Sequence, residues 1–333
     1  MTWLSLSKLL TSLIVVNVMV IALPIQAQQS PEQHSGNTPL MEKSSPGYYR
    51  MMLGDYEVTA LSDGTFGLPA HQLLNGMSEQ NIRKQLAVSY LDSPVETSVN
   101  GYLIHTGDRL ILIDTGAANL FGPTLGKLLT NLEAAGYDGD AVDEVYLTHM
   151  HPDHLGGLIT DGRRAFPNAI IRADQKDLDY WLSDESLAAA SDDNKGFFEG
   201  ARASLQPYID NNQVQGFTGN TEFSEGISAQ ATYGHTPGHS VYVVQSNGHK
   251  LVFWGDLMHV ATVQFEHPDI TIDFDTDQDA AKAQRRHAYE DAARNGYLVA
   301  ASHISFPGIG RIRLSSEGYQ WLPVNYSPVS ENE

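Results

Sequence analysis

One short segment of the sequence, LTHMHPDHLGG, concentrates side chains that can bind metal ions. His149, His151, Asp153 and His154 fall within six consecutive residues, directly after an apolar run. In an extended chain, positions i and i+2 point to the same side, so His149 and His151 can hold one ion. Pro152 prevents the strand from continuing, which leaves Asp153 and His154 at a turn where they can face a second ion. A histidine-rich surface loop is the alternative, but this density after a buried strand favours a metal site.

Three later segments offer further ligands. The glycine-rich turn GHTPGH contains His235 and His239, and the pattern alone does not decide between them. Asp256 and His303 each follow an apolar run that is typical of a buried strand. Each residue taken alone could equally be a helix cap or an ordinary loop histidine. Polar residues at strand ends are where the active sites of layered α/β folds collect, and a carboxylate has two oxygens that can bridge two ions. We therefore expect a centre for two divalent metal ions.

The composition limits the chemistry. None of the 333 residues is cysteine, so any metal must be held by histidines and carboxylates. Zinc is the expected metal, and manganese, cobalt and iron also accept such ligands. Lys plus Arg is 20 and Asp plus Glu is 40, which gives a net charge of −20. This balance argues against a nucleic-acid partner and, weakly, against anionic substrates.

The N-terminal segment is typical of an export signal. Lys8 precedes a run of 15 mainly apolar residues that ends at Leu23, and Ala27 is a small residue at a possible cleavage site. The run is short for a membrane span, although an uncleaved anchor is the alternative. We predict a signal peptide at 1–27, a flexible Gln-, Ser- and Pro-rich leader at 28–47, and one domain at 48–333. The mature protein would be periplasmic or secreted, with no stable membrane insertion after cleavage.

The remaining sequence alternates strand-like and helix-like patterns. Hairpin signals occur around Gly54-Asp55 and Thr106-Gly107-Asp108, and leucines at helical spacing predict a helix at Thr124–Ala135. The Ala-rich stretch Thr276–Asn295 predicts the longest helix, closed by Gly296. This mixture indicates an α/β fold with mixed sheets. The other strands are predicted at Glu144–Thr148, Ala169–Ala173, Ile227–Thr232, Ser240–Gln245, Leu251–Trp254 and Leu298–Ser302, and the other helices at Asp174–Leu182 and Asn194–Tyr208.

The motifs in their order resemble the metallo-β-lactamase superfamily of hydrolases. The series is T-H-x-H-x-D-H-x-G-G, then G-H-T-P-G-H, then G-D and a final S-H, with L-I-D-T-G at 112–116 as an earlier sheet motif. The resemblance runs from about Tyr48 to Ser327 and implies a four-layer αββα sandwich with the metals at one edge. It also implies a role for each residue of the centre. The ligands of one ion would be His149, His151 and His235, those of the other Asp153, His154 and His303, and Asp256 would bridge them.

The same resemblance assigns further roles. Asp153 and Asp256 are the carboxylates expected to act in catalysis, whereas Asp114 and His239 would support the ligands. The absence of cysteine departs from some zinc β-lactamases and fits the esterase and lactonase branches instead.

The C-terminal segments ATVQF at 261–265 and AASHISFPGIG at 300–310 are similar to the methyl parathion hydrolase group and its lactonase and arylesterase relatives. That similarity implies a homodimer and an aromatic substrate pocket, although the same side chains could be ordinary core residues. The pocket residues would be Phe121, Trp181 and Phe198, with Phe197 close by.

These inferences predict an exported hydrolase in which a hydroxide shared by two metal ions attacks a neutral ester. Organophosphate triesters with aryl leaving groups are the expected substrates. The alternative is a lactonase or arylesterase that acts on dihydrocoumarin or acyl-homoserine lactones. A protein of a different class, a periplasmic metal-binding protein without catalysis, would use the same histidines.

Overall fold

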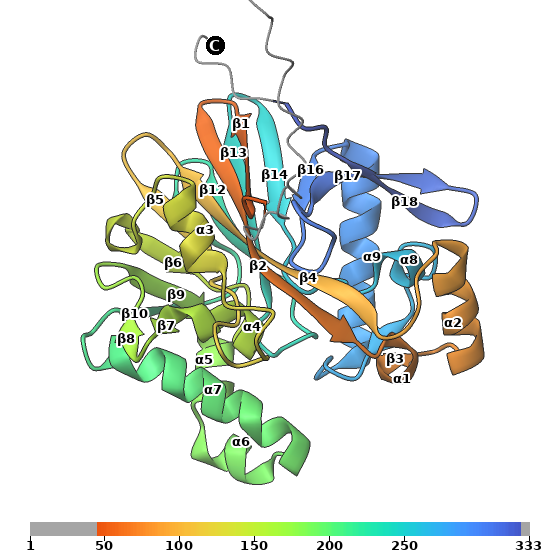
Figure 1. Cartoon of the computed structure of the whole chain (residues 1–333), viewed down its shortest axis with the longest axis horizontal. Helices are drawn as coiled ribbons and strands as arrows, with labels where there is room; N and C mark the ends of the chain where they lie inside the picture. Colours follow the sequence, from red (N-terminus) through yellow and green to blue (C-terminus); the bar gives the residue numbers. More distant parts are fainter. Residues whose placement is uncertain (1–44, 328–333) are drawn as a thin grey trace, which may run out of the picture. The chain divides into compact units, whose positions relative to one another are not determined.

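Two seven-stranded mixed sheets form the centre of the molecule in the computed structural model, which describes residues 45–327 (Figure 1). The predicted signal peptide and nearly all of the predicted leader lie outside these residues. In spatial order, the first sheet contains β1 (Tyr48–Leu53), β2 (Tyr56–Leu68), β4 (Val95–His105), β5 (Leu110–Ile113), β6 (Glu144–Tyr146), β9 (Ile170–Asp174) and β10 (Val214–Phe217). The second contains β11 (Thr221–Ser224), β12 (Ile227–Ala231), β13 (Ser240–Ser246), β14 (His249–Phe253), β16 (Leu298–Ala300), β17 (Ile309–Ser315) and β18 (Gly318–Pro323).

The two sheets pack face to face, as the alternation of side chains along their strands shows. Tyr102 and Ile104 of β4 belong to the same buried cluster as Tyr242 of β13, so this cluster lies between the sheets. Leu103, one residue away, points to the opposite face and joins a cluster with the helices of the first sheet. On the second sheet, Val243 packs in a separate cluster with residues of the long C-terminal helix. Because alternate side chains of a strand point to opposite faces, each sheet has buried apolar side chains on both of its faces.

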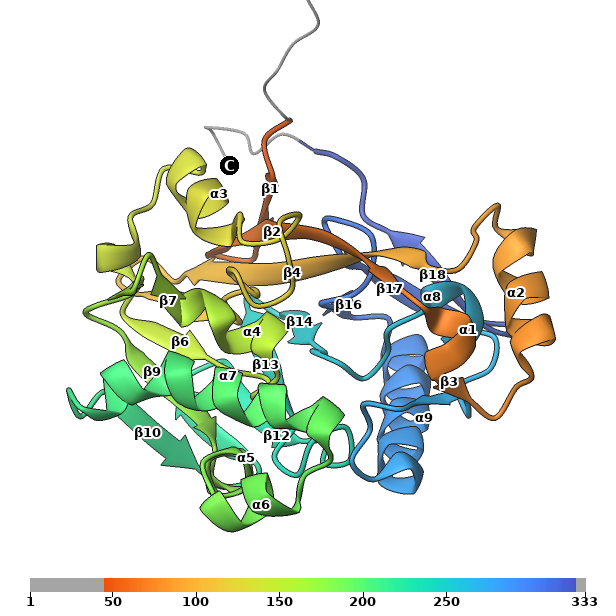
Figure 2. The same ribbon diagram turned by 60° about the horizontal axis from the view of Figure 1, so that its bottom comes forward.

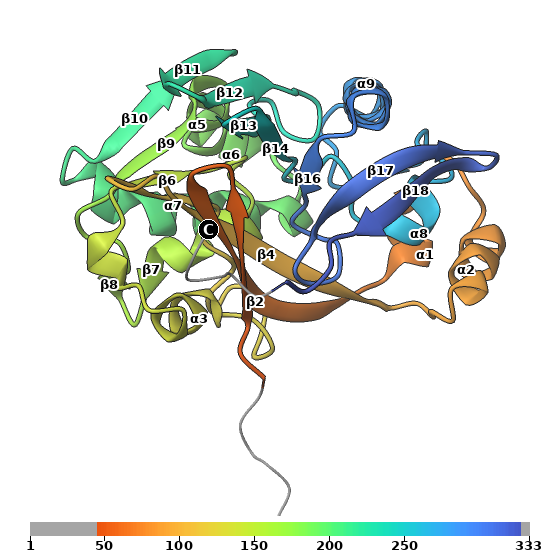
Figure 3. The same cartoon turned by 90° about the horizontal axis from the view of Figure 1, so that it is seen from above.

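Helices cover the outer face of each sheet. Those that contribute to the buried cluster on the first sheet are α3 (Leu128–Ala134), α4 (Pro152–Leu155), α5 (Gln175–Trp181) and α7 (Asp192–Ile209). The long helix α9 (Gln278–Asn295) covers the second sheet beside β17, as Figure 3 shows from above. The prediction of a four-layer αββα sandwich with mixed sheets is therefore confirmed.

Smaller elements complete the described part of the chain. Their bounds are α1 (Ala70–Leu73), β3 (Leu74–Asn75), α2 (Glu79–Val88), β7 (Ile159–Thr160), β8 (Arg163–Arg164), α6 (Asp184–Ala189), α8 (Ala261–Gln264), β15 (Thr271–Ile272) and the short 3₁₀ helices at Gly139–Ala141 and Gly156–Leu158. Figure 2 shows α1, α2 and α8 grouped together, where their apolar side chains share one cluster. Among residues 45–327, no helix combines the length and apolar character that crossing a membrane requires.

The predicted helix at 124–135 was wrong at its start. Helix α3 begins at Leu128, because the preceding residues are held in a loop by Asp63. The Asp63 carboxylate accepts hydrogen bonds from the backbone N–H groups of Ala117, Gly126 and Leu128. Gly126 has a φ of 81°, which an α-helix does not allow. A hydrogen bond between residues 65 positions apart in the sequence thus prevents the helix start that the leucine spacing predicts.

Candidate metal centre

The predicted ligands come from five places in the fold and meet at one edge of the sandwich. His149 and His151 lie in the loop after β6, Asp153 and His154 lie in the short helix α4, and the remaining three follow strands β12, β14 and β16. Figure 2 shows α4 beside the ends of β13 and β14. Strands β14 and β16 are parallel, so their carboxyl ends deliver polar residues to the same edge.

Seven side chains form two groups that can each hold a metal ion. Within each group, the candidate ligand atoms lie within 4.8 Å of one another. Asp256 belongs to both groups, and six of the seven residues are buried. The first group is His149, His151, His235 and Asp256, and the second is Asp153, His154, Asp256 and His303. The structure therefore brings together all of the ligands that the sequence motifs predict.

Hydrogen bonds at the Nδ1 atoms orient three of the imidazoles. Nδ1 of His154 lies 2.8 Å from Asp114 Oδ2, and Nδ1 of His303 lies 2.9 Å from the carbonyl oxygen of Ser98. Nδ1 of His235 lies 2.8 Å from Asp275 Oδ1. An Nδ1–H that donates to an oxygen leaves the Nε2 lone pair free. The Nε2 atoms of His154, His235 and His303 accordingly point at Asp256, at 3.2, 3.3 and 3.1 Å from its nearest oxygen.

The two histidines after β6 complete the first group. Nδ1 of His149 lies 3.1 Å from the Thr148 hydroxyl, which already donates to Asp114 and therefore accepts from the imidazole. Nδ1 of His151 lies 3.1 Å from Nε2 of His235. With the proton of His235 on Nδ1 toward Asp275, its Nε2 carries a lone pair, and His151 and His235 both belong to the first group of ligands.

Unpartnered buried atoms test whether metals fit. Among the described residues, the Nε2 atoms of His149 and His154 and the Oδ1 atom of Asp256 are buried without a hydrogen-bond partner. Leaving such atoms unpaired is costly, and all three lie in the two groups of ligands. Imidazole nitrogens and carboxylate oxygens are ligands that divalent transition metals accept. The residues therefore fit a centre of two divalent ions.

The charges of the ligand side chains are arranged around Asp256. Burial by itself raises the pKa of Asp256, but the surrounding imidazoles outweigh it and hold this pKa well below its usual range. Burial lowers the pKa of His149 and His151 well below the usual value, and the neighbouring histidines lower it further. Burial also acts to lower the pKa of His154, but Asp256, Asp153 and Asp114 outweigh it and raise this pKa well above its usual value. The ionised Asp256 and the neutral His149 and His151 are in the state that binds a cation, whereas His154 must release a proton when an ion binds.

The structure distinguishes the two histidines of the GHTPGH turn. Nε2 of His239 accepts a hydrogen bond from the backbone N–H of Asp256 at 3.1 Å, and its Nδ1 lies 2.8 Å from the Thr232 hydroxyl. Both ring nitrogens are thus engaged by the protein, whereas Nε2 of His235 faces the centre. Burial lowers the pKa of His239 to about 3, so this ring stays neutral and supports the loop of Asp256.

His259 and Asp275 are among the site residues that the sequence analysis missed. His259 is buried, with Nε2 3.0 Å from Asp256 Oδ2 and its ring stacked on that of His303. Its position three residues after Asp256 was the available signal. Asp275, the hydrogen-bond acceptor for His235, follows no motif and could be found only from the fold.

A buried carboxylate ties the two histidine loops together. Asp177 in α5 accepts hydrogen bonds from the backbone N–H of Met150 at 3.0 Å, the hydroxyl of Thr236 at 2.9 Å and the backbone N–H of Gly238 at 2.6 Å. Met150 lies between His149 and His151, and Thr236 follows His235. Asp177 therefore fixes the distance between two loops that carry ligands of the first group.

A narrow aromatic cavity of about 40 Å³ opens onto the centre. The predicted pocket residues Phe121 and Phe197 line it together with Phe66 and Phe274, which were not predicted. The ring of Phe66 stacks on that of Phe121 with their centroids 6.3 Å apart. The other walls are His151, Asp153, Asp256, His259 and His303.

The other two predicted pocket residues are more deeply buried. Trp181 and Phe198 are 3% and 1% exposed, and their rings pack 4.6 Å apart in the core under the first sheet. They also border a second cavity of about 290 Å³ that shares His151, Phe197 and Phe274 with the narrow one. A third cavity of about 310 Å³ shares His259 and His303. The narrow cavity beside the ligands thus shares wall residues with two larger spaces.

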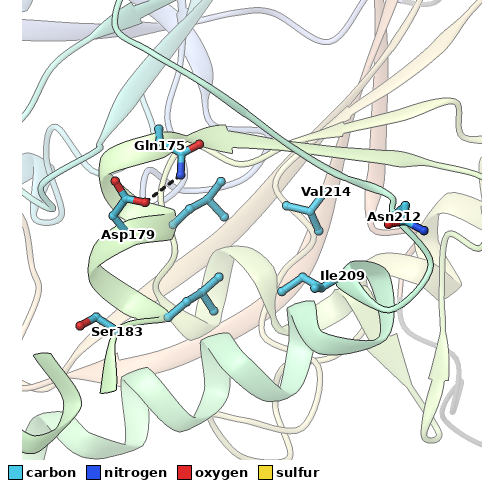
Figure 4. A pocket seen from close by; sticks show the side chains of 8 residues that line it. Gln175, Asp179, Ser183, Ile209, Asn212 and Val214 are labelled. Carbon is cyan, nitrogen blue, oxygen red and sulfur yellow. Dashed lines mark hydrogen bonds between the residues drawn. The ribbon is translucent and has the colours of Figure 1, made fainter. Parts of the chain in front are cut away.

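A further cavity of about 570 Å³ lies between α5, α7 and β10 (Figure 4). Its polar rim includes Gln175 and Asp179, which are hydrogen-bonded to each other. None of the predicted site residues lines it.

The αββα sandwich and the paired ligand groups define a class of protein. A family model of the metallo-beta-lactamase superfamily matches residues 94–301, and the chain belongs to this superfamily. A solved structure of the hydrolase AbOPH in the beta lactamase superfamily has 35% sequence identity and a TM-score of 0.81, covering 86% of this chain and 100% of that one. The structure of AidC, a dizinc quorum-quenching lactonase in complex with a product, has 26% identity and a TM-score of 0.78, covering 85% and 99%.

A curated relative matches over a shorter region. The uncharacterized protein YobT of Bacillus subtilis (strain 168) is 28% identical over 155 residues. The match covers 46% of this chain and 60% of that protein.

Proposed function

We propose that this protein is a hydrolase that uses two divalent metal ions, expected to be zinc, to open lactones and cleave related neutral carboxylic esters. The observation that carries the proposal is the pair of ligand groups that share Asp256 at the end of an aromatic cavity. The relatives support it, because AidC is a dizinc lactonase and AbOPH is a hydrolase.

The chain's own residues would act by positioning. His149, His151 and His235 would hold one ion, Asp153, His154 and His303 the other, and Asp256 both. When bound, such ions activate water at neutral pH and polarise the oxygen of the scissile bond. The four phenylalanines around the cavity would exclude bulk water and hold the apolar part of the substrate. Because the supporting hydrogen bonds already orient the imidazoles, little reorganisation is needed.

The shape of the cavity favours a carbonyl ester over a phosphotriester. The space beside the ligands measures about 40 Å³, whereas the adjoining spaces measure about 290 and 310 Å³. In a lactone, both substituents of the planar carbonyl carbon are tied into one compact ring, so little bulk has to fit beside the ligands. A phosphotriester is tetrahedral around phosphorus and carries three substituents. His259, stacked on His303 beside Asp256, is one of the walls that make this space narrow.

Hydrolysis of aryl phosphotriesters is the second candidate. It is supported by the similarity of the segments at 261–265 and 300–310 to the methyl parathion hydrolase group and by the aromatic walls, which suit an aryl leaving group. We also infer that the enzyme is exported and forms a homodimer. The apolar N-terminal run and the same similarity, respectively, support these two proposals.

A parallel assay tests the proposal. Purified protein of known metal content is supplied with an acyl-homoserine lactone, dihydrocoumarin and methyl paraoxon. We expect two ions per chain and the largest kcat/KM for a lactone. Asp256→Asn should lose both metal occupancy and turnover, whereas Asp279→Asn, which changes an exposed carboxylate of α9, should lose neither. Bound metal that exchanges readily, without turnover of any substrate, would instead indicate a non-catalytic metal-binding protein.

A further inference from the structure

Helix α9 carries a charged residue inside the protein. The Arg285 side chain is completely buried, although guanidinium groups are almost never found without water unless they are paired. Figure 1 shows α9 standing beside β16 and β17, with α8 close to it. Arg285 belongs to none of the motifs from which the metal centre was predicted. Its burial therefore needs an explanation in the structure around it.

The guanidinium contacts two segments that border the metal centre. Nε donates to the carbonyl oxygen of Leu257 at 2.5 Å, and one terminal nitrogen donates to the carbonyl oxygens of Ile270 at 2.7 Å and Pro268 at 3.2 Å. Leu257 directly follows the shared ligand Asp256. Arg285 thus ties the loop after β14 to the segment that precedes Asp275.

The other terminal nitrogen of Arg285 faces a carboxylate. It lies 3.6 Å from Asp275 Oδ2, and both side chains are 0% exposed. Within residues 45–327, Asp275 is the one acidic partner within ion-pair distance of Arg285. Asp275 in turn holds Nδ1 of His235 at 2.8 Å, so a buried chain runs from Arg285 through Asp275 to His235.

A buried amide makes a companion link. Oε1 of Gln264 accepts hydrogen bonds from the backbone N–H groups of His259 and Val260, and its Nε2 donates to the carbonyl oxygen of Ile270. Arg285 and Gln264 therefore converge on the same carbonyl. Together they join the segment 256–260 to the segment 268–275.

We propose that Arg285 is a positioning residue of the metal centre: it fixes the segments that carry Asp256 and Asp275, and its charge compensates the carboxylate that orients His235. The inference rests on the metal centre of the proposed function. Arg285 touches no ligand itself and acts through Asp275 and the Leu257 carbonyl. A lysine could supply the charge but not the planar fork that reaches three carbonyl groups and a carboxylate.

Metal affinity separates this role from a purely structural one. The variants are Arg285→Met, Arg285→Lys and Asp275→Asn, with Tyr289→Leu as a matched control. Tyr289 is a fully buried residue of the same helix, one turn further on, and packs on Trp254 rather than on Asp275. Each full-length protein is assessed by urea unfolding and by zinc titration against a chromophoric chelator. The cobalt-loaded forms are compared by visible absorption, which reports the ligand geometry.

We expect Arg285→Met to weaken the binding of one zinc ion about 10- to 100-fold, as loss of a residue that supports a ligand typically does. Its cobalt spectrum should change, and Arg285→Lys should fall between it and the wild type. Tyr289→Leu should be destabilised but bind both ions as the wild type does. The double variant Arg285→Met with Asp275→Asn should lose less zinc affinity than the sum of the two single losses, because Arg285 acts in part through that carboxylate.

Unchanged zinc affinity and an unchanged cobalt spectrum in Arg285→Met would overturn the proposal. A double variant whose loss in zinc-binding free energy equals the sum of the two single losses would also overturn it. If Arg285→Met does not fold, Arg285→Lys provides the test. Wild-type zinc affinity in Arg285→Lys would show that the planar guanidinium is not needed and would overturn the proposal. Failure of the proposed function is distinguishable from these outcomes, because the wild type itself would then bind no pair of ions or show no turnover.

Discussion

Asp177 offers a sharp test of how the two histidine loops are held, through the change Asp177→Asn. The carboxylate is buried and accepts three hydrogen bonds, from Met150, Thr236 and Gly238. Asparagine has nearly the same shape but carries an NH₂ group in place of one oxygen. Whichever way the amide is turned, this group faces a backbone N–H, that of Met150 or that of Gly238. We expect this mismatch to cost about 1–3 kcal/mol of unfolding free energy at every pH.

The second effect depends on pH. Burial raises the pKa of Asp177 from 3.8 to about 6, despite the three hydrogen bonds. The folded state then holds its proton more tightly than the unfolded state. This contribution to stability is fully present below pH 3.8 and is lost as the pH rises through about 6. The difference in the pKa of Asp177 between the folded and unfolded states corresponds to about 3 kcal/mol of unfolding free energy. About 2 kcal/mol of this is lost between pH 4 and pH 7.

Asparagine does not titrate, so the variant lacks this pH-dependent loss. The unfolding free energy of Asp177→Asn minus that of the wild type should therefore increase by about 2 kcal/mol from pH 4 to pH 7. Urea unfolding followed by tryptophan fluorescence measures both proteins, each metal-free, so that loss of metal at low pH does not contribute. Asp179→Asn, an exposed carboxylate on the same helix, controls for the substitution itself. A difference that stays constant within about 0.5 kcal/mol over this range would refute the reasoning.

Four further predictions address the centre, its cavity and the core beside it. Phe197→Ala should raise KM for lactones and aryl esters, since Phe197 lines both the narrow cavity and its neighbour. Trp181→Ala should instead lower the unfolding free energy measured in urea by about 3–5 kcal/mol, because its buried ring packs against Phe198 in the core. Asp114→Asn should weaken metal binding about 10- to 100-fold in a zinc titration, because Asp114 is the acceptor for His154 Nδ1, and wild-type affinity would contradict this role. Exhaustive chelation should abolish turnover and lower the urea midpoint, with both restored by zinc; activity that survives chelation would exclude the proposed metal centre.

The sequence alone was informative where the chemistry is local. His149 and His151 are separated by one residue, so an extended backbone points both to one side regardless of the rest of the fold. Asp256 and His303 follow apolar runs, so their position at strand ends could be inferred from the pattern. The alternation of strand and helix patterns likewise predicted a layered α/β sandwich with mixed sheets. The helix predicted at 124–135 failed because Asp63, far away in the chain, holds part of that segment in a loop.

The tertiary structure decided which nitrogen atoms remain free and what supports them. His235 and His239 are equivalent in the sequence, but the backbone of Asp256 and the Thr232 hydroxyl occupy both nitrogens of His239. The acceptor that orients His235 lies 40 residues away in the sequence, and the one that orients His303 lies 205 residues away. Such contacts depend on how sheets, loops and α9 pack together, because a hydrogen bond needs its two atoms within about 3 Å and no sequence spacing encodes that distance. The motifs therefore determined which residue types can bind metal, and the packing determined their orientation, their supports and the narrow cavity beside them.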